Sequence, residues 1–278
     1  MSEIKVNKLS PRSGTTVTIG DSGDTVNIVG TLQNNGSVIP GDISSVVAGT
    51  GLTGALVVDG GTVKLDGNYP TGTDNVALGD TALDSVEAGG NENIAIGSKA
   101  GTAITTGDSN TAVGHEALKA NTTAFGNTAI GADALRENIT GANNVGVGLC
   151  SLRNNQTGGS NTAIGFRAAE DTTGAANTAV GTCALFDNSS GGNNVAVGKE
   201  ALGNNTTASS NTAVGMSALA ANTTGTPNVA VGNFSLCANT TGASNTGVGF
   251  CALRNNTEGD SNTGFGRGAS QTNATGDD

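Results

Sequence analysis

A short pattern of polar, small and aliphatic residues recurs along most of the chain. It runs Asn, then Thr, Val or Ile, then Ala or Gly, then an aliphatic residue or Phe, then Gly. Twelve copies follow one another, and nine of the eleven spacings between them are 17 residues, with one of 18 and one of 16. The copies begin at Asn75, Asn93, Asn110, Asn127, Asn144, Asn161, Asn177, Asn194, Asn211, Asn228, Asn245 and Asn262. Such regular self-similarity indicates one structural unit repeated along an axis.

The period and the alternation within each copy predict a β-solenoid. We number the positions of each copy from its first Asn, which is position 1. A unit of 17 residues is too short for a helix pair or for a propeller blade of about 40 residues, but it fits one turn of a solenoid. Side chains alternate across a strand, so positions 2 and 4 share one face and positions 3 and 5 share the other. We therefore expect an all-β fold, a parallel β-roll or β-solenoid of twelve coils.

The narrow interior of each coil is expected to hold the aliphatic side chains. Position 5 is Gly in all twelve copies, position 8 is Ala in ten and Ser in two, and position 9 is Leu in nine. We expect position 4, such as Val113, and position 9, such as Leu118 on a second short strand, to stack inside. The small residues at positions 3 and 5, such as Ala112 and Gly114, then form an outer strip that a neighbouring subunit can approach closely.

Asparagine marks two corners of each coil, at position 1 and near position 12. Its side chain can bond the backbone and it tolerates left-handed conformations, which suits a corner. Asparagines stacked in register can also form hydrogen-bonded ladders along the axis. The second corner is an Asn-x-(Thr/Ser) triplet, which is a glycosylation acceptor in secreted proteins, but its recurrence within the coil favours the structural interpretation. Examples begin at Asn121, Asn138, Asn155, Asn205, Asn222 and Asn239.

The chain ahead of the repeats has a different organisation. Three alternating runs, Glu3–Leu9, Thr15–Ile19 and Thr25–Val29, read as short strands separated by Gly and Pro. Asn35-Gly36 is a strong hairpin signal, and Asp59-Gly60-Gly61 is another. We therefore expect three parts. Residues 1–36 form a small β-rich domain, residues 37–74 a β-rich neck, and residues 75–278 the solenoid.

Composition narrows the class of protein. The 278 residues include 45 Gly but only 6 Phe, 1 Tyr and no Trp, so a thick enzyme core is hard to build. The net charge of −11 disfavours nucleic acid as a partner. No apolar run is long enough for a membrane span, and no secretory signal peptide is visible at the first residues. The spacings of Cys150, Cys183, Cys237 and Cys251 match no metal or redox motif, which favours free thiols over disulfides.

No constellation of catalytic, cofactor-binding or metal-ligating residues emerges from the repeats. Acids occur at the variable positions 6, 7 and 10, which we expect to face solvent, and His115 beside Glu116 has no nucleophile placed near it. A Thr ladder suited to ice binding is broken, because Val or Ile replaces Thr at position 2 in five copies. Phenylalanines at irregular positions are expected to fill gaps between coils or subunits, with a shallow ligand surface as the alternative. The acids are Asp80, Glu116, Asp133, Glu170 and Glu200, and the phenylalanines are Phe166, Phe186, Phe234 and Phe250.

The Asn-Thr-Ala-Val-Gly-x-x-Ala-Leu copies over residues 75–278 resemble the head repeats of trimeric autotransporter adhesins. They are more similar still to longer versions in tail fibres of tailed phages, especially marine ones. The segment Ile43–Gly54 resembles a connector that precedes such repeats in phage fibre proteins, and Met1–Gly20 looks like the start of fibre-like structural proteins of marine cyanobacterial phages.

This resemblance implies a homotrimer about a three-fold axis. It implies a structural virion protein held by its amino terminus on a tail or capsid protein, with the far end turned toward a host receptor. Such a protein assembles in the host cytoplasm and leaves in the virion, and it is not an enzyme and needs no cofactor. The alternative is an adhesin whose solenoid surface itself binds a host glycan or protein.

Overall fold

The structure is a computed structural model that describes residues 33–34, 37–38 and 72–276. In the first part, β1 (Gln33–Asn34) pairs antiparallel with β2 (Ser37–Val38), with Gln33 opposite Val38. The antiparallel pairing that a hairpin at Asn35-Gly36 predicts is therefore present. The three expected runs before it, the Asp59-Gly60-Gly61 turn, and the bounds proposed for 1–36 and 37–74 lie outside the described residues.

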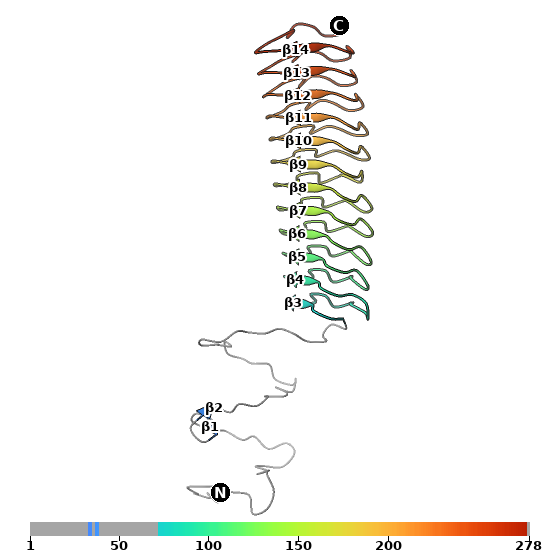
Figure 1. Ribbon diagram of the computed structural model, residues 1–278, viewed down its shortest axis with the longest axis vertical. Helices are drawn as coiled ribbons and strands as arrows, with labels where there is room; N and C mark the ends of the chain where they lie inside the picture. Colours follow the sequence, from blue (N-terminus) through green and yellow to red (C-terminus); the bar gives the residue numbers. More distant parts are fainter. Residues whose placement is uncertain (1–32, 35–36, 39–71, 277–278) are drawn as a thin grey trace, which may run out of the picture. The chain divides into compact units, whose positions relative to one another are not determined.

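The repeats form a parallel β-solenoid with one three-residue strand in each coil (Figure 1). All twelve strands belong to one sheet, and each pairs only with the strands of the coils before and after it. The register is unbroken, so each strand position pairs with the same position of the next coil, as Thr111 pairs with Thr128. The strands are β3 (Val76–Leu78), β4 (Ile94–Ile96), β5 (Thr111–Val113), β6 (Thr128–Ile130), β7 (Val145–Val147), β8 (Thr162–Ile164), β9 (Thr178–Val180), β10 (Val195–Val197), β11 (Thr212–Val214), β12 (Val229–Val231), β13 (Thr246–Val248) and β14 (Thr263–Phe265).

The second strand expected around position 9 is absent from the described coils, and a tight turn takes its place. Glu116 at position 7 and Leu118 at position 9 both have left-handed backbones, with φ of 55° and 50°. The Glu116 N–H donates to Ser98 O of the preceding coil, and the Leu118 N–H donates to Ala134 O of the following coil, both at 3.0 Å. These bonds to both neighbours offset the roughly 1–2 kcal/mol that each left-handed residue costs.

The prediction of which strand face lies inside was wrong. Position 3 is buried, as at Ala112 (1% exposed) and Ala129 (0%), whereas position 4 faces outward, as at Ile130 (41% exposed). The reason is volume. Each Leu at position 9 is fully buried against the strand, and a Cβ added to Gly264 would lie only 2.9 Å from Leu253 Cγ. Only a methyl group or a hydrogen fits opposite the leucine, so position 3 belongs to the core and does not receive a neighbouring subunit.

Glycine is required at position 5, where the strand ends and the turn begins. Gly114 has φ of 138°, a conformation that L residues rarely adopt. A Cβ at this position would lie 2.5 Å from the carbonyl oxygen of Gly131 in the next coil. The same contact recurs in eleven copies, and the twelfth, Gly266, keeps a positive φ of 117°, which accounts for Gly at position 5 throughout.

Two buried asparagine ladders run along the axis, as the repeat predicted. In the first, the Asn127 N–H donates to Asn110 Oδ1 at 3.0 Å, and Asn110 Nδ2 donates to Ala124 O at 2.9 Å. In the second, Asn222 Nδ2 donates to Asn205 Oδ1 at 3.0 Å. All the position 12 asparagines named above are 0% exposed, so the glycosylation alternative is excluded at these triplets in the folded solenoid.

Candidate functional site

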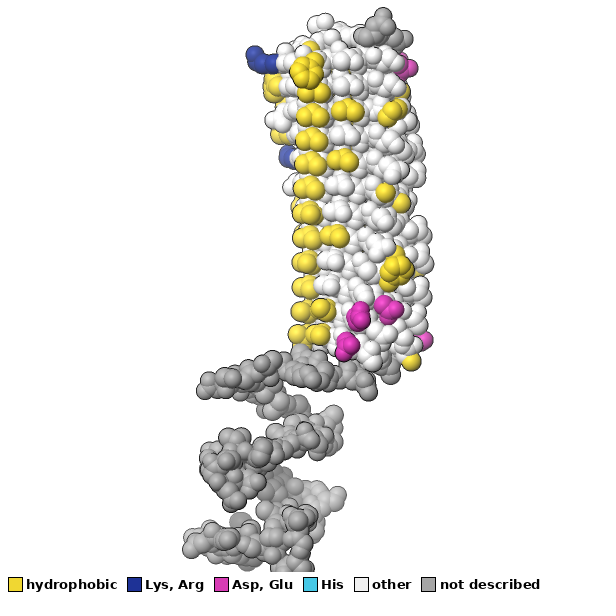
Figure 2. Space-filling view, viewed as in Figure 1, with side chains coloured by type: hydrophobic (Ala, Val, Ile, Leu, Met, Phe, Trp, Pro, Cys, Tyr) yellow, Lys and Arg dark blue, Asp and Glu magenta, His cyan; other side chains and the backbone are white. Residues whose placement is uncertain are grey.

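The most prominent surface feature is a continuous apolar column, which we call the aliphatic stripe. It consists of the position 4 side chains, one from each coil, and Figure 2 shows it as an unbroken yellow line along the solenoid. Six of its members are exposed, from Val231 at 37% to Leu78 at 43% and the terminal Phe265 at 81%, and the other six are partly exposed. The stripe consists of Leu78, Ile96, Val113, Ile130, Val147, Ile164, Val180, Val197, Val214, Val231, Val248 and Phe265. Contiguous apolar surface of this extent is typical of an interaction site.

Position 2 flanks the stripe on the same strand face. Seven coils carry Thr there and five carry Val or Ile, so the flank is mixed where the stripe is uniform. Figure 2 accordingly shows only scattered yellow side chains beside the column. Neighbouring strands lie roughly 4.8 Å apart. The outer face of the sheet is therefore a regular array of Thr and apolar side chains. This is a surface for packing rather than a cleft for chemistry.

A charged cluster lies on the turn side of the coils, centred on Glu116. The prediction that the variable-position acids face solvent holds for Asp80 and Glu200 but was wrong for Glu116 and Glu170, which are 7% and 4% exposed. Three cations surround Glu116, namely Lys99 at 3.4 Å, Lys119 at 3.0 Å and Arg136 at 2.8 Å. Registered stacking explains the burial, because it brings positions 7 and 10 of successive coils together.

The electrostatics of this cluster are those of a structural ion-pair network. The Lys119 hydrogen bond, with help from Lys99 and Arg136, lowers the pKa of Glu116 from 4.5 to about 2, against the opposing effect of burial. Ligand atoms of His115, Glu116 and Asp133 lie within 4.8 Å of one another. However, three positive side chains already neutralise Glu116, and they oppose the approach of a metal cation.

A second buried acid is held in the same way. Arg167 Nε pairs with Glu170, and Arg153 Nη1 lies 3.7 Å from the same carboxylate. The Arg167 guanidinium also stacks over Phe186, with its Cζ 4.4 Å from the ring centre. Phe186 therefore fills a gap between coils, as expected for the irregular phenylalanines. Opposite charges at positions 7 and 10 of adjacent coils are the sequence signal for both ion-pair clusters, which the predictions from single coils did not include.

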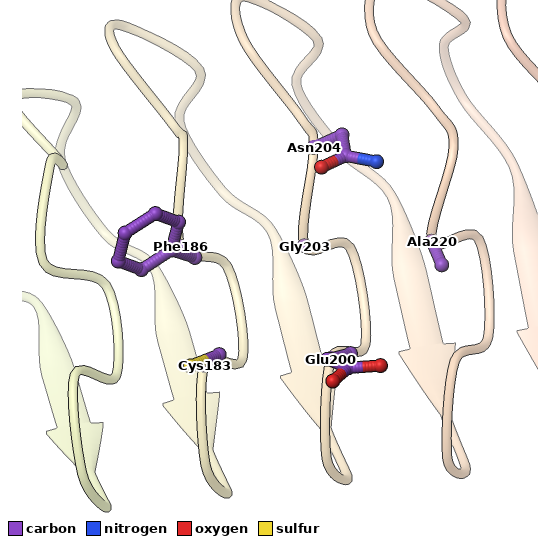
Figure 3. A pocket seen from close by; sticks show the side chains of 6 residues that line it. All are labelled: Cys183, Phe186, Glu200, Gly203, Asn204 and Ala220. Carbon is purple, nitrogen blue, oxygen red and sulfur yellow. The ribbon is translucent and has the colours of Figure 1, made fainter.

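A shallow hollow of about 160 Å³ lies beyond Phe186, where Gly203 and Ala220 leave position 10 without bulk. Figure 3 shows the Phe186 ring leaning away from Gly203 toward the preceding coil. The only carboxylate in the lining is that of Glu200, which Lys199 pairs at 3.2 Å. A glycosidase needs two carboxylates across a groove, and this hollow does not provide them.

A larger hollow of about 460 Å³ lies on the same side at the last two coils. It is lined by Phe250, Cys251, Arg254, Arg267, Gly268 and Gln271. Phe250, 48% exposed, meets Phe234 edge to face with ring centres 6.4 Å apart. Phe234 and Phe250 thus bridge neighbouring coils, as expected, and Phe250 also lines the hollow, whereas the ligand surface stays a prediction.

The four cysteines are free thiols in the structure. Burial, followed by the nearby Glu170 carboxylate, raises the pKa of the Cys150 thiol and so makes it less reactive. Cys150, Cys183 and Cys251 share position 7, and the nearest of these pairs is two coils apart, roughly 9–10 Å at the usual strand spacing. That separation exceeds the roughly 7 Å limit between the Cα atoms of a disulfide.

Searches with the chain match no protein-family model, no curated protein and no solved structure. Across the part of the chain that the structure describes, no helix is long and apolar enough to cross a membrane. The described repeats form an all-β solenoid.

Proposed function

We propose that this chain is a stiff homotrimeric spacer in a phage virion appendage, such as a tail fibre. Residues 1–36 attach it to a tail or capsid protein, and the solenoid presents its far end to the host. The chain itself performs no catalysis in this role. The observation that carries the proposal is the aliphatic stripe, because a monomer would leave twelve apolar side chains exposed or partly exposed to water.

In a closed three-fold trimer, the aliphatic stripe of each chain packs against the stripes of the other two chains. Full burial of a Val or Ile side chain contributes about 1.5–3 kcal/mol, so completing the burial of a partly exposed one contributes about 1 kcal/mol. Twelve such side chains supply on the order of 10 kcal/mol for each chain, which is comparable with the roughly 4–15 kcal/mol that association costs. Three parallel copies also keep each rung beside its equivalent, and cyclic symmetry closes the contact without leaving a free stripe.

The internal ladders suit a spacer. Backbone bonds join every coil to its neighbours on the strand side and on the turn side, and the asparagine ladder adds a side-chain bond at each step from Asn75 to Asn262. Each coil contacts only its neighbours, so the array resists bending through many equivalent short-range bonds. The likeness of residues 75–278 to phage fibre repeats supports the virion setting.

The test compares two matched double variants of the full chain by light scattering. Val180→Lys with Val197→Lys places two charges in the stripe, whereas Ser190→Lys with Thr207→Lys places the same charges at exposed position 14 of the same coils. We expect three chains per particle for the parent and for the control. The stripe variant is expected to give monomers. A monomeric parent, or a stripe variant that remains trimeric, would contradict the proposal.

The second candidate is an adhesin whose solenoid surface binds a host glycan. The observation in its favour is the hollow at the last two coils, where an exposed aromatic ring lies beside two arginines. The two functions are compatible, because the stripe occupies position 4 and the hollow occupies positions 6, 7 and 10.

A further inference from the structure

The two arginines of the last coils differ from every other cation in the described residues. Lys99, Lys119, Arg136, Arg153, Arg167 and Lys199 each have a carboxylate within reach of their charged nitrogens. Within residues 72–276, Arg254 and Arg267 pair with no carboxylate, although the chain carries a net charge of −11. Their positive charges are therefore available to pair with an anionic group from outside the described solenoid.

Aromatic rings hold both guanidinium groups in place. Arg267 Cζ lies 5.8 Å from the ring centre of Phe250, and Arg254 Cζ lies 5.8 Å from that of Phe234. The two rings meet at an interplanar angle of 88°, so they form one aromatic support under both arginines. A cation–π contact uses the flat face of the guanidinium and leaves its N–H edge free to donate.

The space in front of these donors has the size and lining of a small-molecule site. Its volume of about 460 Å³ falls in the roughly 300–1,000 Å³ range of ligand pockets. Gln271 adds an amide, and Gly268 contributes no side chain at a position that Phe234 and Cys251 fill in the two preceding coils. The smaller hollow at Gly203 provides a contrast, because its charged lining group is the carboxylate of Glu200.

We propose that this hollow binds an acidic saccharide, with Arg254 and Arg267 receiving its carboxylate or phosphate group and Phe250 receiving a face of the sugar ring. Planar guanidinium forks match both oxyanions, and charge-assisted bonds are about twice as strong as neutral ones. The half-exposed ring of Phe250 favours a sugar over a free anion, because an inorganic ion gains nothing from an apolar face. The inference deepens the proposed function by assigning the chemistry of a host contact, and it does not depend on trimer formation through the stripe.

The experiment titrates the full chain by calorimetry with four probes: methyl glucuronide, glucose 6-phosphate, methyl glucoside and inorganic phosphate. We expect methyl glucuronide or glucose 6-phosphate to bind, and the better of the two identifies the anion. The neutral glucoside and inorganic phosphate should bind at least about tenfold more weakly, because the glucoside lacks the anionic group and phosphate lacks the sugar ring. Absence of binding by both acidic sugars, or equal binding of the neutral glucoside, would overturn the proposal.

Matched variants distinguish binding at a defined site from non-specific attraction to positive charge. Arg254→Gln and Arg267→Gln should each weaken binding of the acidic sugar by about tenfold or more. Lys199→Gln removes one positive charge from an exposed lysine of another coil and should leave binding unchanged. Phe250→Leu should weaken acidic-sugar binding but not that of inorganic phosphate. Equal loss in Lys199→Gln and Arg267→Gln would refute a defined site, and light scattering of the same samples reports trimer formation separately.

Discussion

Ile104 fills the core space that Gly101 leaves at the position where most coils carry Leu. Ile104 is 1% exposed, and a Cβ added to Gly101 would lie 2.9 Å from Ile104 Cδ1 and 3.0 Å from Leu83 Cδ2. In this coil position 9 has no side chain, and position 12, which is Asn in nine of the twelve copies, supplies an aliphatic one. The core thus conserves volume across two positions of the same coil.

This exchange predicts a strong coupling between the two residues. Gly101→Leu alone should overpack the core and destabilise the protein by about 1–3 kcal/mol. Adding Ile104→Asn recreates the usual Leu and Asn pair, and the backbone already fits, with φ of 56° at Gly101 against 50° at Leu118. Chemical denaturation at one fixed protein concentration should show that the double variant recovers most of the loss. Additive losses in the double variant would mean that the residues do not share one space.

The asparagine ladder predicts a large cost for a single buried amide. Asn211 Oδ1 accepts the Asn228 N–H at 2.8 Å, and its Nδ2 donates to Gly225 O at 3.0 Å. Asn211→Ala leaves the buried Asn228 N–H without a partner, while Gly225 O keeps the bond from Asn222 Nδ2. The variant should be destabilised by roughly 1–3 kcal/mol. The control Asn204→Ala, at an exposed position, should change stability by less than about 0.5 kcal/mol. Similar losses in both variants would show that the ladder contributes little.

The cluster around Glu116 predicts a pH dependence. Its pKa is depressed from 4.5 to about 2, so its ion pairs stabilise the fold above pH 4.5, and that contribution is lost as the pH falls toward 2. Glu116→Gln should be less stable than the parent at neutral pH, and the difference should shrink between pH 4.5 and 2. Thermal melts across this window give the comparison. Glu200→Gln, at a side chain 49% exposed, is the control and should leave the profile unchanged.

The period predicts that one coil is a removable unit. Deleting Asn177–Asn193 places Asn194 where Asn177 was, so the coil that begins at Asn194 stacks on the coil that begins at Asn161. The buried Ala column and the asparagine ladder are then continuous again. The solenoid should remain folded and shorten by about 4.8 Å. Deleting only Asn177–Ala184 removes a strand and breaks the stack. Melting temperatures and electron-microscope lengths should differ sharply between the two, and equal damage would contradict the 17-residue unit.

Much of the solenoid could be predicted from the sequence, because its period is a covalent property of the chain. The position of the first strand, the parallel register and the asparagine ladders follow from that period, whereas the second strand expected around position 9 is a turn. The inward face did not follow, since alternation states which residues share a face but not which face is buried. The size range at position 4, from Val113 to Phe265, was the missed signal, because a core one leucine thick cannot accept both.

The ion-pair clusters and the hollow at the last two coils were missed for a different reason. They depend on contacts between coils, and each coil taken alone shows only an isolated charge at a variable position. Stacking Lys99 on Glu116, both at position 7, pairs an exposed lysine with a carboxylate that the neighbouring coils bury. The same superposition places Arg267 beside Phe250, both at position 6. Comparing equal positions of successive coils is the analysis that reveals such sites.

The central claim, that three solenoids pack through their aliphatic stripes, is tested most directly by the cross-section of the assembled shaft in electron cryo-microscopy. We predict three solenoids related by a three-fold axis, with strands β3 to β14 facing that axis and the turns carrying Glu116 and Arg254 facing outward. The density should repeat along the shaft at about 4.8 Å. A single solenoid in cross-section, or three solenoids whose position 4 side chains face solvent, would contradict the claim.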